Sequence, residues 1–535
     1  MKFRKFLPLL MALPLASCSF DFFGLFKKKE LVIPTVDVDS IKVNLPSLPS
    51  RNTGAIRSAD GFDYIDLYEL SDFHGAVNTE QHTSGTYIGL PKLADFFDKK
   101  RSENPGGTLI LSSGDMFQGS ADSNLTRGYM VNYSMQYMGF DAMAIGNHEF
   151  DWTDEWMKKN AELKYNTSSI PFLGANITKN GEIPSFLKKS TVVSRGEYKI
   201  GVIGVIGNEL ETSILKSCVA EYDFSKYKEI VEAESARLRS EDGCNVVVLL
   251  AHEGADKIEQ LNNGAVDAIF GGHAHENKVS SNGSVPSLAT KNYGQSVAQI
   301  SLKFNSADKS FVAAENSNII EMKDVASSLK ENADVKAIMN EYASAIDEIK
   351  NIKLGRCNAD LKYDKSLKNI CTKSMHEAAI RSIEANGNSG IDTSKVIAAY
   401  HNVNGGIRDD ILKGKITYGN VYRSFPFDNE VVLYKVSGKD FIAKCGTLSS
   451  LGIYKTIESK SDIKSDEDYY IVTTDYLALG KEFSAFKSDE GGITDEDLIR
   501  TGCVVRDEVA QKIYSIGRVK DAEWSKSSSE FRILS

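Results

Sequence analysis

Aspartate, asparagine and histidine side chains gather at five points in the first half of the sequence, each just after a short apolar run. The five points are Ser71-Asp72-Phe73-His74-Gly75, Ser113-Gly114-Asp115, Gly146-Asn147-His148-Glu149, His252-Glu253-Gly254 and Gly271-Gly272-His273-Ala274-His275. Five of the eight histidines of the chain lie in them. A packing role explains any one of these histidines, but burying so many polar groups together is costly unless metal ions or hydrogen bonds satisfy them. The pattern therefore predicts a metal site.

The apolar runs that precede these points have the length of strands. They are YIDLYEL, TLILS, DAMAI, NVVVLLA and VDAIF, and a further run, YKIGVIGVIG, lies among them. The helical periodicity of FSKYKEIVEAESARL between two of the runs indicates that strands alternate with helices, as in a layered α/β domain. In such sheets ligands bind at the carboxyl ends of the strands, so these side chains are expected to converge.

The ordered motifs Asp-Phe-His-Gly, Gly-Asp, Gly-Asn-His-Glu-Phe-Asp, His-Glu and Gly-His-Ala-His cover residues 70–275. This set resembles the calcineurin-like metallophosphoesterases, and more narrowly the bacterial 5'-nucleotidase family. By that resemblance, two divalent metal ions share a bridging Asp115. The resemblance implies that one ion is held by Asp72, His74, Asp115 and His275. It implies that the other is held by Asp115, Asn147, His252 and His273.

His148 and Asp151 take the catalytic roles that the resemblance implies. His148 is expected to contact the phosphoryl group rather than a metal ion and to stabilise the transition state. Asp151 is expected to accept a hydrogen bond from the other ring nitrogen of His148, which fixes the tautomer and favours the charged imidazole. An alternative for Asp151 is a carboxylate in the first turn of a helix. Glu149 is expected to support the site rather than to act in it.

Two metal ions suit the hydrolysis of a phosphate ester for a reason that is independent of the resemblance. In-line displacement needs a nucleophile at neutral pH and neutralisation of the charge on the phosphoryl oxygens. Two divalent ions about 3.5–4 Å apart acidify a shared water and clamp those oxygens, so that a metal-bridging hydroxide can attack phosphorus. Imidazole and carboxylate ligands favour Zn, Mn, Fe or Co over Ca but do not choose among them.

The residues that are expected to bind the substrate lie in the second half of the chain. Asn404-Gly405-Gly406-Ile407-Arg408 resembles a family loop in which the arginine binds phosphate, and the resemblance also suggests Phe427 and Tyr476 as two aromatic faces around a nucleobase. Where the family continues with Gly-Gly-Asp-Gly and an aromatic, this chain has Gly480-Lys481-Glu482-Phe483, so Glu482 is the candidate for the ribose contact. The alternatives are a solvated Gly-Gly turn and aromatic residues that belong to the core.

The length of 535 residues predicts at least two domains. The resemblance implies an α/β fold: a four-layer metallophosphoesterase β-sandwich flanked by helices, a long linker helix, and a smaller α+β substrate-binding domain. Apolar residues at spacings of three and four support the helix; they are Val335, Ile338, Met339, Tyr342, Ile346 and Ile349. The expected divisions are a signal peptide (1–17), a tether (18–60), the metallophosphoesterase domain (61–322), the linker helix (323–353), the substrate domain (354–520) and a tail (521–535).

The start of the chain predicts export. MKFRK is basic, FLPLLMALPLAS is apolar but too short to span a bilayer, and Leu-Ala-Ser-Cys resembles a bacterial lipobox, so that lipid on Cys18 would anchor the mature protein to a membrane outside the cytoplasm. An ordinary signal peptide with a chance cysteine is the alternative. The six later cysteines permit disulfides in an exported protein, Cys357 with Cys371 for example, or remain free thiols. The formal charge of −10 argues against a nucleic-acid partner.

These observations predict an extracytoplasmic, lipid-anchored hydrolase that acts on nucleoside 5'-monophosphates, with di- and triphosphates or UDP-sugars as further substrates. A phosphodiesterase acting on cyclic nucleotides or other diesters is the near alternative, since the two-metal chemistry is the same. A non-catalytic surface protein that binds a ligand is the alternative of another class. The sequence leaves the preferred substrate, the metal identity and the oligomeric state open.

Overall fold

The computed structural model describes residues 30–82, 85–254, 256–261, 264–282, 284–385, 390–486 and 493–525. The expected signal peptide, Cys18 and most of the expected tail lie outside these residues. The chain forms two compact units: an N-terminal unit, Ile41–Ile346, and a C-terminal unit made of Asp347–Ser535 with Met1–Ser40. Among the described residues, no helix combines the length and the apolar character that crossing a membrane requires.

The N-terminal unit contains two large mixed sheets. The first has the strand order β17-β16-β2-β5-β6-β7, with β1 paired to β2, and the second has the order β14-β15-β13-β12-β10-β9. The strands of the first sheet are β1 (Arg57–Ala59), β2 (Phe62–Glu69), β5 (Thr108–Ser112), β6 (Ala142–Ala144), β7 (Phe172–Leu173), β16 (Ser296–Asn305) and β17 (Phe311–Glu321). Those of the second are β9 (Ser190–Arg195), β10 (Tyr198–Ile206), β12 (Val246–His252), β13 (Ala268–Gly271), β14 (Lys278–Asn282) and β15 (Val285–Ala289). The strands β2, β5, β6 and β7 are parallel, as are β10, β12, β13 and β15, so the carboxyl ends in each set share one edge.

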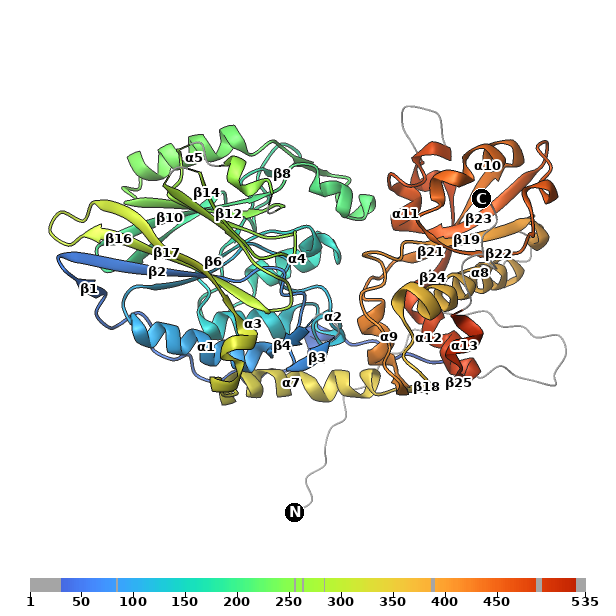
Figure 1. The fold of residues 1–535 in the computed structure, drawn as a ribbon, viewed down its shortest axis with the longest axis horizontal. Helices are drawn as coiled ribbons and strands as arrows, with labels where there is room; N and C mark the ends of the chain where they lie inside the picture. Colours follow the sequence, from blue (N-terminus) through green and yellow to red (C-terminus); the bar gives the residue numbers. More distant parts are fainter. Residues whose placement is uncertain are drawn as a thin grey trace, which may run out of the picture. The chain divides into compact units, whose positions relative to one another are not determined.

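The two sheets pack face to face and are covered by helices on their outer faces (Figure 1). A fully buried apolar cluster with members such as Leu67, Val248 and Ile300 fills the space between them. Helix α1 (Gly89–Glu103) covers the first sheet, where Phe96 meets Tyr68 edge to face with ring centroids 6.3 Å apart, and α5 (Lys228–Ser240) packs on the second. The layers are therefore helix, sheet, sheet, helix, and the predicted four-layer α/β fold is confirmed.

Shorter elements complete the N-terminal unit. They are β3 (Glu80–His82), β4 (Gly85–Tyr87), β8 (Ile177–Lys179), β11 (Tyr222–Phe224), α2 (Ala121–Leu125), α3 (Tyr129–Met138), α4 (Thr153–Glu162) and α6 (Met322–Val325). The paired strands β8 and β11 lie beside α4, since Lys179 forms an ion pair with Asp154 of that helix, 2.6 Å away. Helices α2 and α3 follow β5, and α4 follows β6, so both segments leave the sheet edge that carries candidate site residues.

The expected linker helix is α7 (Ala333–Lys350), which begins ten residues later than predicted. Asn332 explains the later start, because its Oδ1 accepts hydrogen bonds from the backbone N–H groups of Asp334 and Val335 and so caps the helix. The predicted apolar stripe is buried at every position except Met339, which is half-buried. The helix crosses the boundary between the two units, whereas the exact domain limits stay a prediction.

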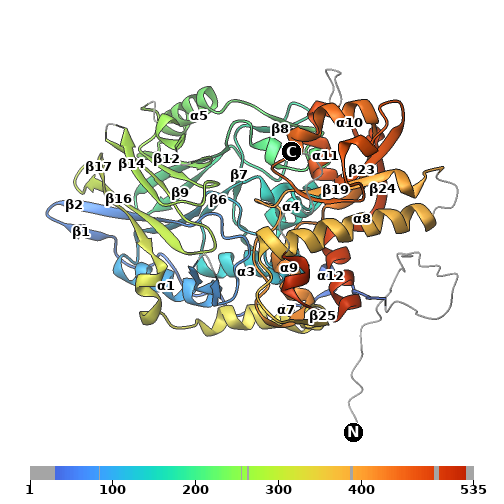
Figure 2. The same ribbon diagram turned by 45° about the vertical axis from the view of Figure 1, so that its right-hand side comes forward.

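The C-terminal unit is α+β, as predicted. Its larger sheet has the order β22-β19-β23-β21-β24, and its smaller one has the order β20-β18-β25. The strands are β18 (Lys353–Cys357), β19 (Val396–His401), β20 (Gly414–Thr417), β21 (Glu430–Ser437), β22 (Gly452–Lys455), β23 (Asp468–Thr474), β24 (Leu498–Val504) and β25 (Arg518–Val519). The helices are α8 (Lys368–Ala385), α9 (Tyr418–Ser424), α10 (Gly438–Lys444), α11 (Asp475–Leu479), α12 (Val505–Ile516) and α13 (Asp521–Trp524). Helix α8 lies along the larger sheet (Figure 2).

The structure adds two observations to the expectations from the sequence. The described part of the expected tether is folded against the rest of the chain: Leu31 N–H donates to Oε1 of Gln511 within the C-terminal unit, and Pro46 O accepts from the Tyr165 hydroxyl within the N-terminal unit. Hydrogen-bond partners for the backbone thus hold a segment whose composition resembles a linker. The six cysteines after Cys18 are all free thiols, so Cys357 and Cys371 do not form a disulfide.

Candidate metal and active site

The predicted metal ligands all lie at the carboxyl ends of strands, where loops from both sheets meet. Asp72 and His74 follow β2, Asp115 follows β5, and Asn147 follows β6 in the first sheet. His252 is the last residue of β12, and His273 and His275 follow β13 in the second. Five of the seven are buried, and His273 and His275 are half-buried. The structure therefore brings together all seven side chains that the sequence singled out.

Three of these side chains form a first group, made of Asp72, His74 and His275, whose ligand atoms lie within 4.8 Å of one another. Nε2 of His74 is 3.1 Å from Nε2 of His275, and that nitrogen is 3.4 Å from Oδ1 of Asp72. Two imidazole nitrogens and a carboxylate oxygen thus point at one small volume. This donor set suits a divalent transition metal.

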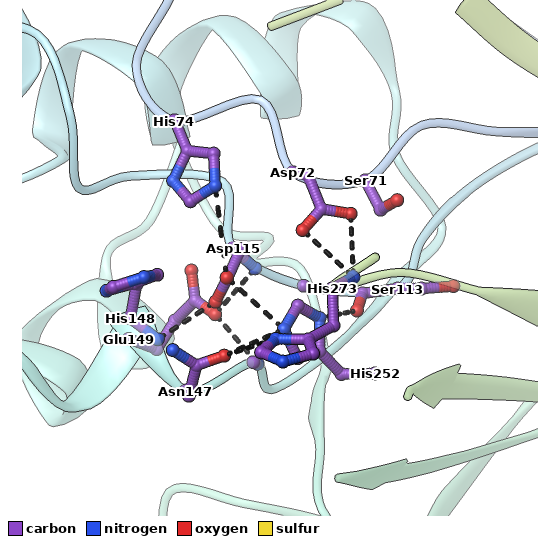
Figure 3. A network of polar contacts seen from close by, with 12 residues as sticks. Ser71, Asp72, His74, Ser113, Asp115, Asn147, His148, Glu149, His252 and His273 are labelled. Carbon is purple, nitrogen blue, oxygen red and sulfur yellow. Dashed lines mark hydrogen bonds and ion pairs between the residues drawn. The ribbon is translucent and has the colours of Figure 1, made fainter. Parts of the chain in front are cut away.

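The second group, Asp115, His252 and His273, meets the same 4.8 Å limit (Figure 3). Oδ2 of Asp115 is 3.2 Å from Nε2 of His252 and 4.0 Å from Nε2 of His74, so this carboxylate lies between the two groups. Oδ1 of Asn147 is 3.1 Å from Nε2 of His252 and 3.0 Å from Nδ1 of His273. The position of Asp115 is the one that a bridging ligand needs.

Backbone carbonyls orient two of the histidines. Nδ1 of His74 lies 3.0 Å from the carbonyl oxygen of Gln118, and Nδ1 of His252 lies 2.7 Å from that of Ser113. A carbonyl can only accept a hydrogen bond, so each Nδ1 carries a proton and donates. Each Nε2 therefore keeps its lone pair for the interior of the site when the ring is neutral, which is the tautomer that a metal ligand requires.

The charges of the site call for a cation at its centre. Burial favours the neutral form of Asp115, but contact with His252 outweighs it and holds the pKa of Asp115 well below its usual range. Burial likewise opposes protonation of His252, yet the carboxylate of Asp115 raises the pKa of His252 to about 10. Burial and the charge of His252 lower the pKa of His273 to about 4. A proton on His252 thus supplies positive charge at the position where a metal ion could supply it instead.

Backbone strain is concentrated at the same residues. Five of the seven candidate ligands have positive φ: Asp72 (49°), His74 (47°), Asp115 (55°), His273 (69°) and His275 (56°). Each such conformation costs about 1–3 kcal/mol for a residue other than glycine, and it persists only where the surroundings enforce it. Gly114, at φ 98°, permits the tight approach of the Asp115 loop to the next strand end, because a Cβ there would stand 2.5 Å from the backbone nitrogen of Gly146. Strain gathered at candidate ligands points to function rather than to folding.

His148 and Asp151 form the pair that the sequence suggests. Nδ1 of His148 lies 2.8 Å from Oδ2 of Asp151, three residues further along a turn of 3₁₀ helix. The backbone N–H of His148 donates to Oδ1 of Asp115, 2.9 Å away, and its ring centroid is 5.3 Å from that of His74. His148 therefore borders the first group while its carboxylate partner occupies the nitrogen on the far side of the ring.

Glu149 holds the loops that carry the ligands. Its Oε2 accepts hydrogen bonds from the N–H groups of Asp115 and Gly146, both at 2.8 Å, and its Oε1 accepts one from Met116 at 2.9 Å. Burial, assisted by the charge of Asp115, raises the pKa of Glu149 to about 7. Its supporting role agrees with the expectation from the sequence, although the motif alone could not name its three donors.

A second buried glutamate next to the site, Glu69, was not indicated by the sequence. It is the last residue of β2. Oε1 of Glu69 accepts the N–H of Ser113, the residue whose carbonyl orients His252. Burial, and then the nearby charge of Asp72, raise the pKa of Glu69 to about 8. The sequence signal that could have indicated Glu69 is a glutamate at the end of an apolar strand, whose last five residues are all buried.

The candidate substrate residues of the C-terminal unit are less closely grouped. The structure brings two of them together: the guanidinium of Arg408 lies over the ring of Phe427, 5.2 Å from its centroid. Asn404 and Glu482 have exposed side chains, and the Glu482 carboxylate lies back against Gly480. Tyr476 is half-buried and packs against the core cluster of this unit.

Arg506, which no motif indicated, organises the loop that carries Phe427. Its guanidinium donates to the carbonyl oxygens of Pro426 and Phe427, at 3.4 and 3.2 Å, and to Oδ1 of Asp428 at 2.7 Å. It also stacks on the ring of Tyr422, 3.8 Å from its centroid. A planar group with five donors can serve all these partners at once, which lysine cannot.

Two family models match the sequence. The model of the calcineurin-like phosphoesterases matches residues 67–277, and that of the 5'-nucleotidase C-terminal domain matches residues 346–443. The first match spans every candidate ligand, and the second spans Arg408 and Phe427. The order of the two matches is the order of the two units.

Individual relatives are distant. The chain is 25% identical to "Cell wall protein Lmo0130" of Listeria monocytogenes over 82% of its own length and 66% of the relative's. It is 24% identical to "Trifunctional nucleotide phosphoesterase protein YfkN" of Bacillus subtilis over 85% of its own length and 36% of the relative's. The chain thus spans less than two thirds of each of these relatives. Among solved structures, a 5'-nucleotidase precursor from Thermus thermophilus matches with a TM-score of 0.67 and 20% identity, over 88% of this chain and 99% of that one.

Proposed function

The chain belongs to the 5'-nucleotidase family, with a calcineurin-like phosphoesterase domain followed by a 5'-nucleotidase C-terminal domain, and on this premise we propose that it releases phosphate from nucleoside 5'-phosphates with two divalent metal ions. One observation carries the proposal: two groups of metal-ligating side chains lie next to each other at one edge of the sheets, with Asp115 between them. The printed name of the YfkN relative, a nucleotide phosphoesterase, supports the substrate class.

The donor atoms fit a pair of metal ions. We assign Asp72, His74, Asp115 and His275 to one ion, and Asp115, Asn147, His252 and His273 to the other. In support, Nε2 of His252 faces two oxygens, from Asp115 and Asn147, within 3.2 Å, so a neutral His252 would direct three lone-pair donors at one cation. When bound, two such ions lower the pKa of a water and neutralise charge on phosphoryl oxygens.

His148 and Asp151 act on the phosphoryl group in this proposal. The hydrogen bond from Nδ1–H of His148 to Asp151 fixes the ring, stabilises its charged form and leaves Nε2 to donate to a phosphoryl or leaving oxygen. The half-buried position of His148 lets substrate reach it. A positioned group of this kind is worth about 10²–10⁴ in rate.

The C-terminal unit supplies substrate contacts. Arg408 would bind a phosphate and Phe427 would stack on the base, since the guanidinium and the ring already adjoin each other. Tyr476 would provide the second aromatic face, with Asn404 and Glu482 as polar contacts to the nucleoside. The exposure of Asn404 and Glu482 leaves both side chains open to a ligand.

The proposal also includes an anchor outside the cytoplasm. The basic and apolar start of the chain and its Leu-Ala-Ser-Cys sequence favour cleavage before Cys18 and lipid on that cysteine. One relative is named a cell wall protein. Replacing Cys18 with alanine should release the protein from the membrane fraction. A variant that stays with the membrane would refute the lipid anchor.

The decisive test uses the soluble chain that begins after Cys18, loaded with Zn²⁺ or Mn²⁺. Phosphate release is measured with AMP, ATP, UDP-glucose, cyclic nucleotides and non-nucleotide phosphate esters. We expect the highest kcat/KM for a nucleoside 5'-phosphate. After the metal ions are removed with a chelator, we expect no phosphate release. Preference for a cyclic nucleotide would make the protein a phosphodiesterase instead, and metal binding without hydrolysis of any substrate would make it a binding protein.

His148→Ala tests the catalytic assignment. The rate should fall by about 10²–10⁴ while both metal ions stay bound. Asp154→Asn is the matched control, because that carboxylate lies three residues beyond Asp151 and forms an ion pair with Lys179. A His148→Ala rate within severalfold of the wild type would remove His148 from the mechanism.

A further inference from the structure

The loop of residues 290–295, which follows β15, touches every member of the group Asp72, His74 and His275. The N–H of Tyr293 donates to the carbonyl oxygen of Asp72 at 2.8 Å. The ring of Tyr293 lies 5.6 Å from that of His74, centroid to centroid. Nδ2 of Asn292 lies 3.0 Å from Nδ1 of His275. No motif in the sequence indicated this loop.

Several contacts fix the loop in place. Tyr293 has positive φ (57°) and stacks on Tyr87, with ring centroids 4.6 Å apart. The N–H of Lys291 donates to Oδ1 of Asn277 at 3.0 Å, and Nε2 of Gln295 donates to Oδ1 of Asn292 at 3.2 Å. The hydrogen bonds of Lys291 and Gln295 and the stacking of Tyr293 therefore hold Asn292 against His275.

Asn292 differs in kind from the partners of the other oriented histidines. The carbonyl groups that face Nδ1 of His74 and of His252 can only accept, so they fix a single tautomer. A side-chain amide offers an acceptor on one side and donors on the other. The Nδ1 atom of His275 can thus meet either, depending on which way the Asn292 amide is turned.

These groups form one consistent chain of hydrogen bonds when Nε2 of His275 carries the proton. Nδ1–H of His74 donates to Gln118, which makes Nε2 of His74 an acceptor for Nε2–H of His275, 3.1 Å away. Nδ1 of His275 is then the acceptor for Nδ2–H of Asn292, whose Oδ1 accepts from Gln295. A proton on Nε2 of His275 occupies the place where the first group would hold a metal ion.

We propose that Asn292 is the positioning residue of His275, and that the direction of its amide decides whether Nε2 of His275 carries a proton or a lone pair. This inference rests on the proposed metal centre. Turning the Asn292 amide by half a rotation presents Oδ1 to the ring, so the proton sits on Nδ1 and Nε2 is free to bind. Gln295 must turn with it, so that its Oε1 accepts from Nδ2 of Asn292. No net proton is gained or lost, because the imidazole changes only its tautomer.

Three substitutions test the role of the Asn292 amide. Asn292→Asp places a carboxylate that can only accept beside Nδ1, so Nδ1 must carry a proton. Asn292→Leu keeps the size and removes both functions. Gln295→Glu is the indirect variant: its carboxylate can only accept from Nδ2 of Asn292, so it turns the amide without touching His275. It also stands in if either change at Asn292 prevents folding.

The first readout is Zn²⁺ binding, measured by competition with a chelator and by metal content after dialysis. Partners behind a ligating histidine typically change metal affinity by about 10- to 100-fold. We therefore expect Asn292→Leu to weaken one of two sites by about that factor, Asn292→Asp and Gln295→Glu to strengthen the same site, and the other site to stay unchanged. Equal affinities in all variants would overturn the inference, and so would a matched change at both sites.

The second readout is the tautomer itself, which a merely structural role would not move. In ion-free protein labelled with ¹⁵N-histidine, the His275 signals should report a proton on Nε2 in the wild type and on Nδ1 in Asn292→Asp. The same tautomer in both would refute the inference even if affinities differed. A wild type that binds no Zn²⁺ would instead contradict the proposed function, so the two failures are distinguishable.

Discussion

The loops of the metal centre and the loops of the C-terminal candidate site both carry polar and charged side chains, yet they are built differently. At the metal centre the ligands leave the ends of parallel strands, and buried hydrogen bonds to the carboxylate of Glu149 and to backbone carbonyls hold them. In the C-terminal unit most candidates lie on irregular loops, where Asn404 and Glu482 face solvent, and Tyr476 lies in the short helix α11. Buried hydrogen bonds fix the side chains of the first site, whereas the second site has both exposed side chains and one contact between Arg408 and Phe427.

The difference lies in what fixes each loop. Strand register places Asp72 and Asp115 next to each other at one edge of the first sheet, and the packing of the two sheets brings His252 of the second sheet to them, so the fold itself builds most of the metal centre. The Phe427 loop instead receives three hydrogen bonds from one buried side chain, that of Arg506. Loss of one contact should therefore affect the metal centre mainly through metal binding and the C-terminal loop mainly through substrate affinity.

Replacing the shared carboxylate should produce the largest effect. Asp115→Ala removes the side chain that lies between both groups, so neither retains its full ligand set. Phosphate release is expected to fall by at least about 10⁴-fold, the upper end for loss of a single positioned group. Metal analysis of the purified variant should find both ions lost. Retention of two ions would show that Asp115 does not bridge.

Glu149→Gln tests how strongly the metal centre depends on its supporting carboxylate. A glutamine oxygen can replace only one carboxylate oxygen, so at least one of three buried N–H donors loses its acceptor, at about 1–3 kcal/mol of stability. Metal affinity should fall by about 10- to 100-fold. Glu155→Gln, exposed in the first turn of α4, is the control and should change neither quantity. A wild-type metal affinity in Glu149→Gln would mean that strand register alone shapes the centre.

The same difference explains what could be predicted from the sequence. Apolar runs ending in Asp, Asn or His identified the strands and all seven candidate ligands, because parallel strands turn a linear pattern into a spatial one. The pattern could not show that Asn292 faces His275 or that Arg506 holds Phe427, because such contacts come from loops and helices that meet through tertiary packing. The sequence could not choose between disulfides and the free thiols that the structure has, because cysteine spacing carries no information on side-chain direction.

Arg506→Lys should act on substrate binding with a smaller effect. Lysine keeps the charge but cannot donate to Phe427, Asp428 and Tyr418 while stacking on Tyr422. We expect KM for a nucleotide to rise about 10-fold, equivalent to about 1.4 kcal/mol, with kcat within severalfold of the wild type. Arg500→Lys is the control, because its ion pairs with Glu430 and Asp495 are partly exposed. A fall in kcat with unchanged KM would argue that this loop serves catalysis rather than binding.

The smallest expected effect comes from the titration of Glu69. It should contribute a slope to the free energy of unfolding as a function of pH. Burial raises the pKa of Glu69 to about 8 in the folded chain, above the ordinary value of 4.5, so between these pH values the native state holds a proton that the unfolded state has released. Stability of the metal-free protein should therefore fall as pH rises through this window, by at most about 1.4 kcal/mol per pH unit from this group.

Glu69→Gln imitates the protonated acid and should flatten that slope while its oxygen still accepts the N–H of Ser113. Denaturant unfolding at several pH values with chelator present measures the slope, and Glu162→Gln, exposed at the end of α4, is the control. An unchanged slope would mean that Glu69 is ionised in the folded chain. The site would then hold one more negative charge behind His252, and its demand for a cation would be stronger than the ligands alone impose.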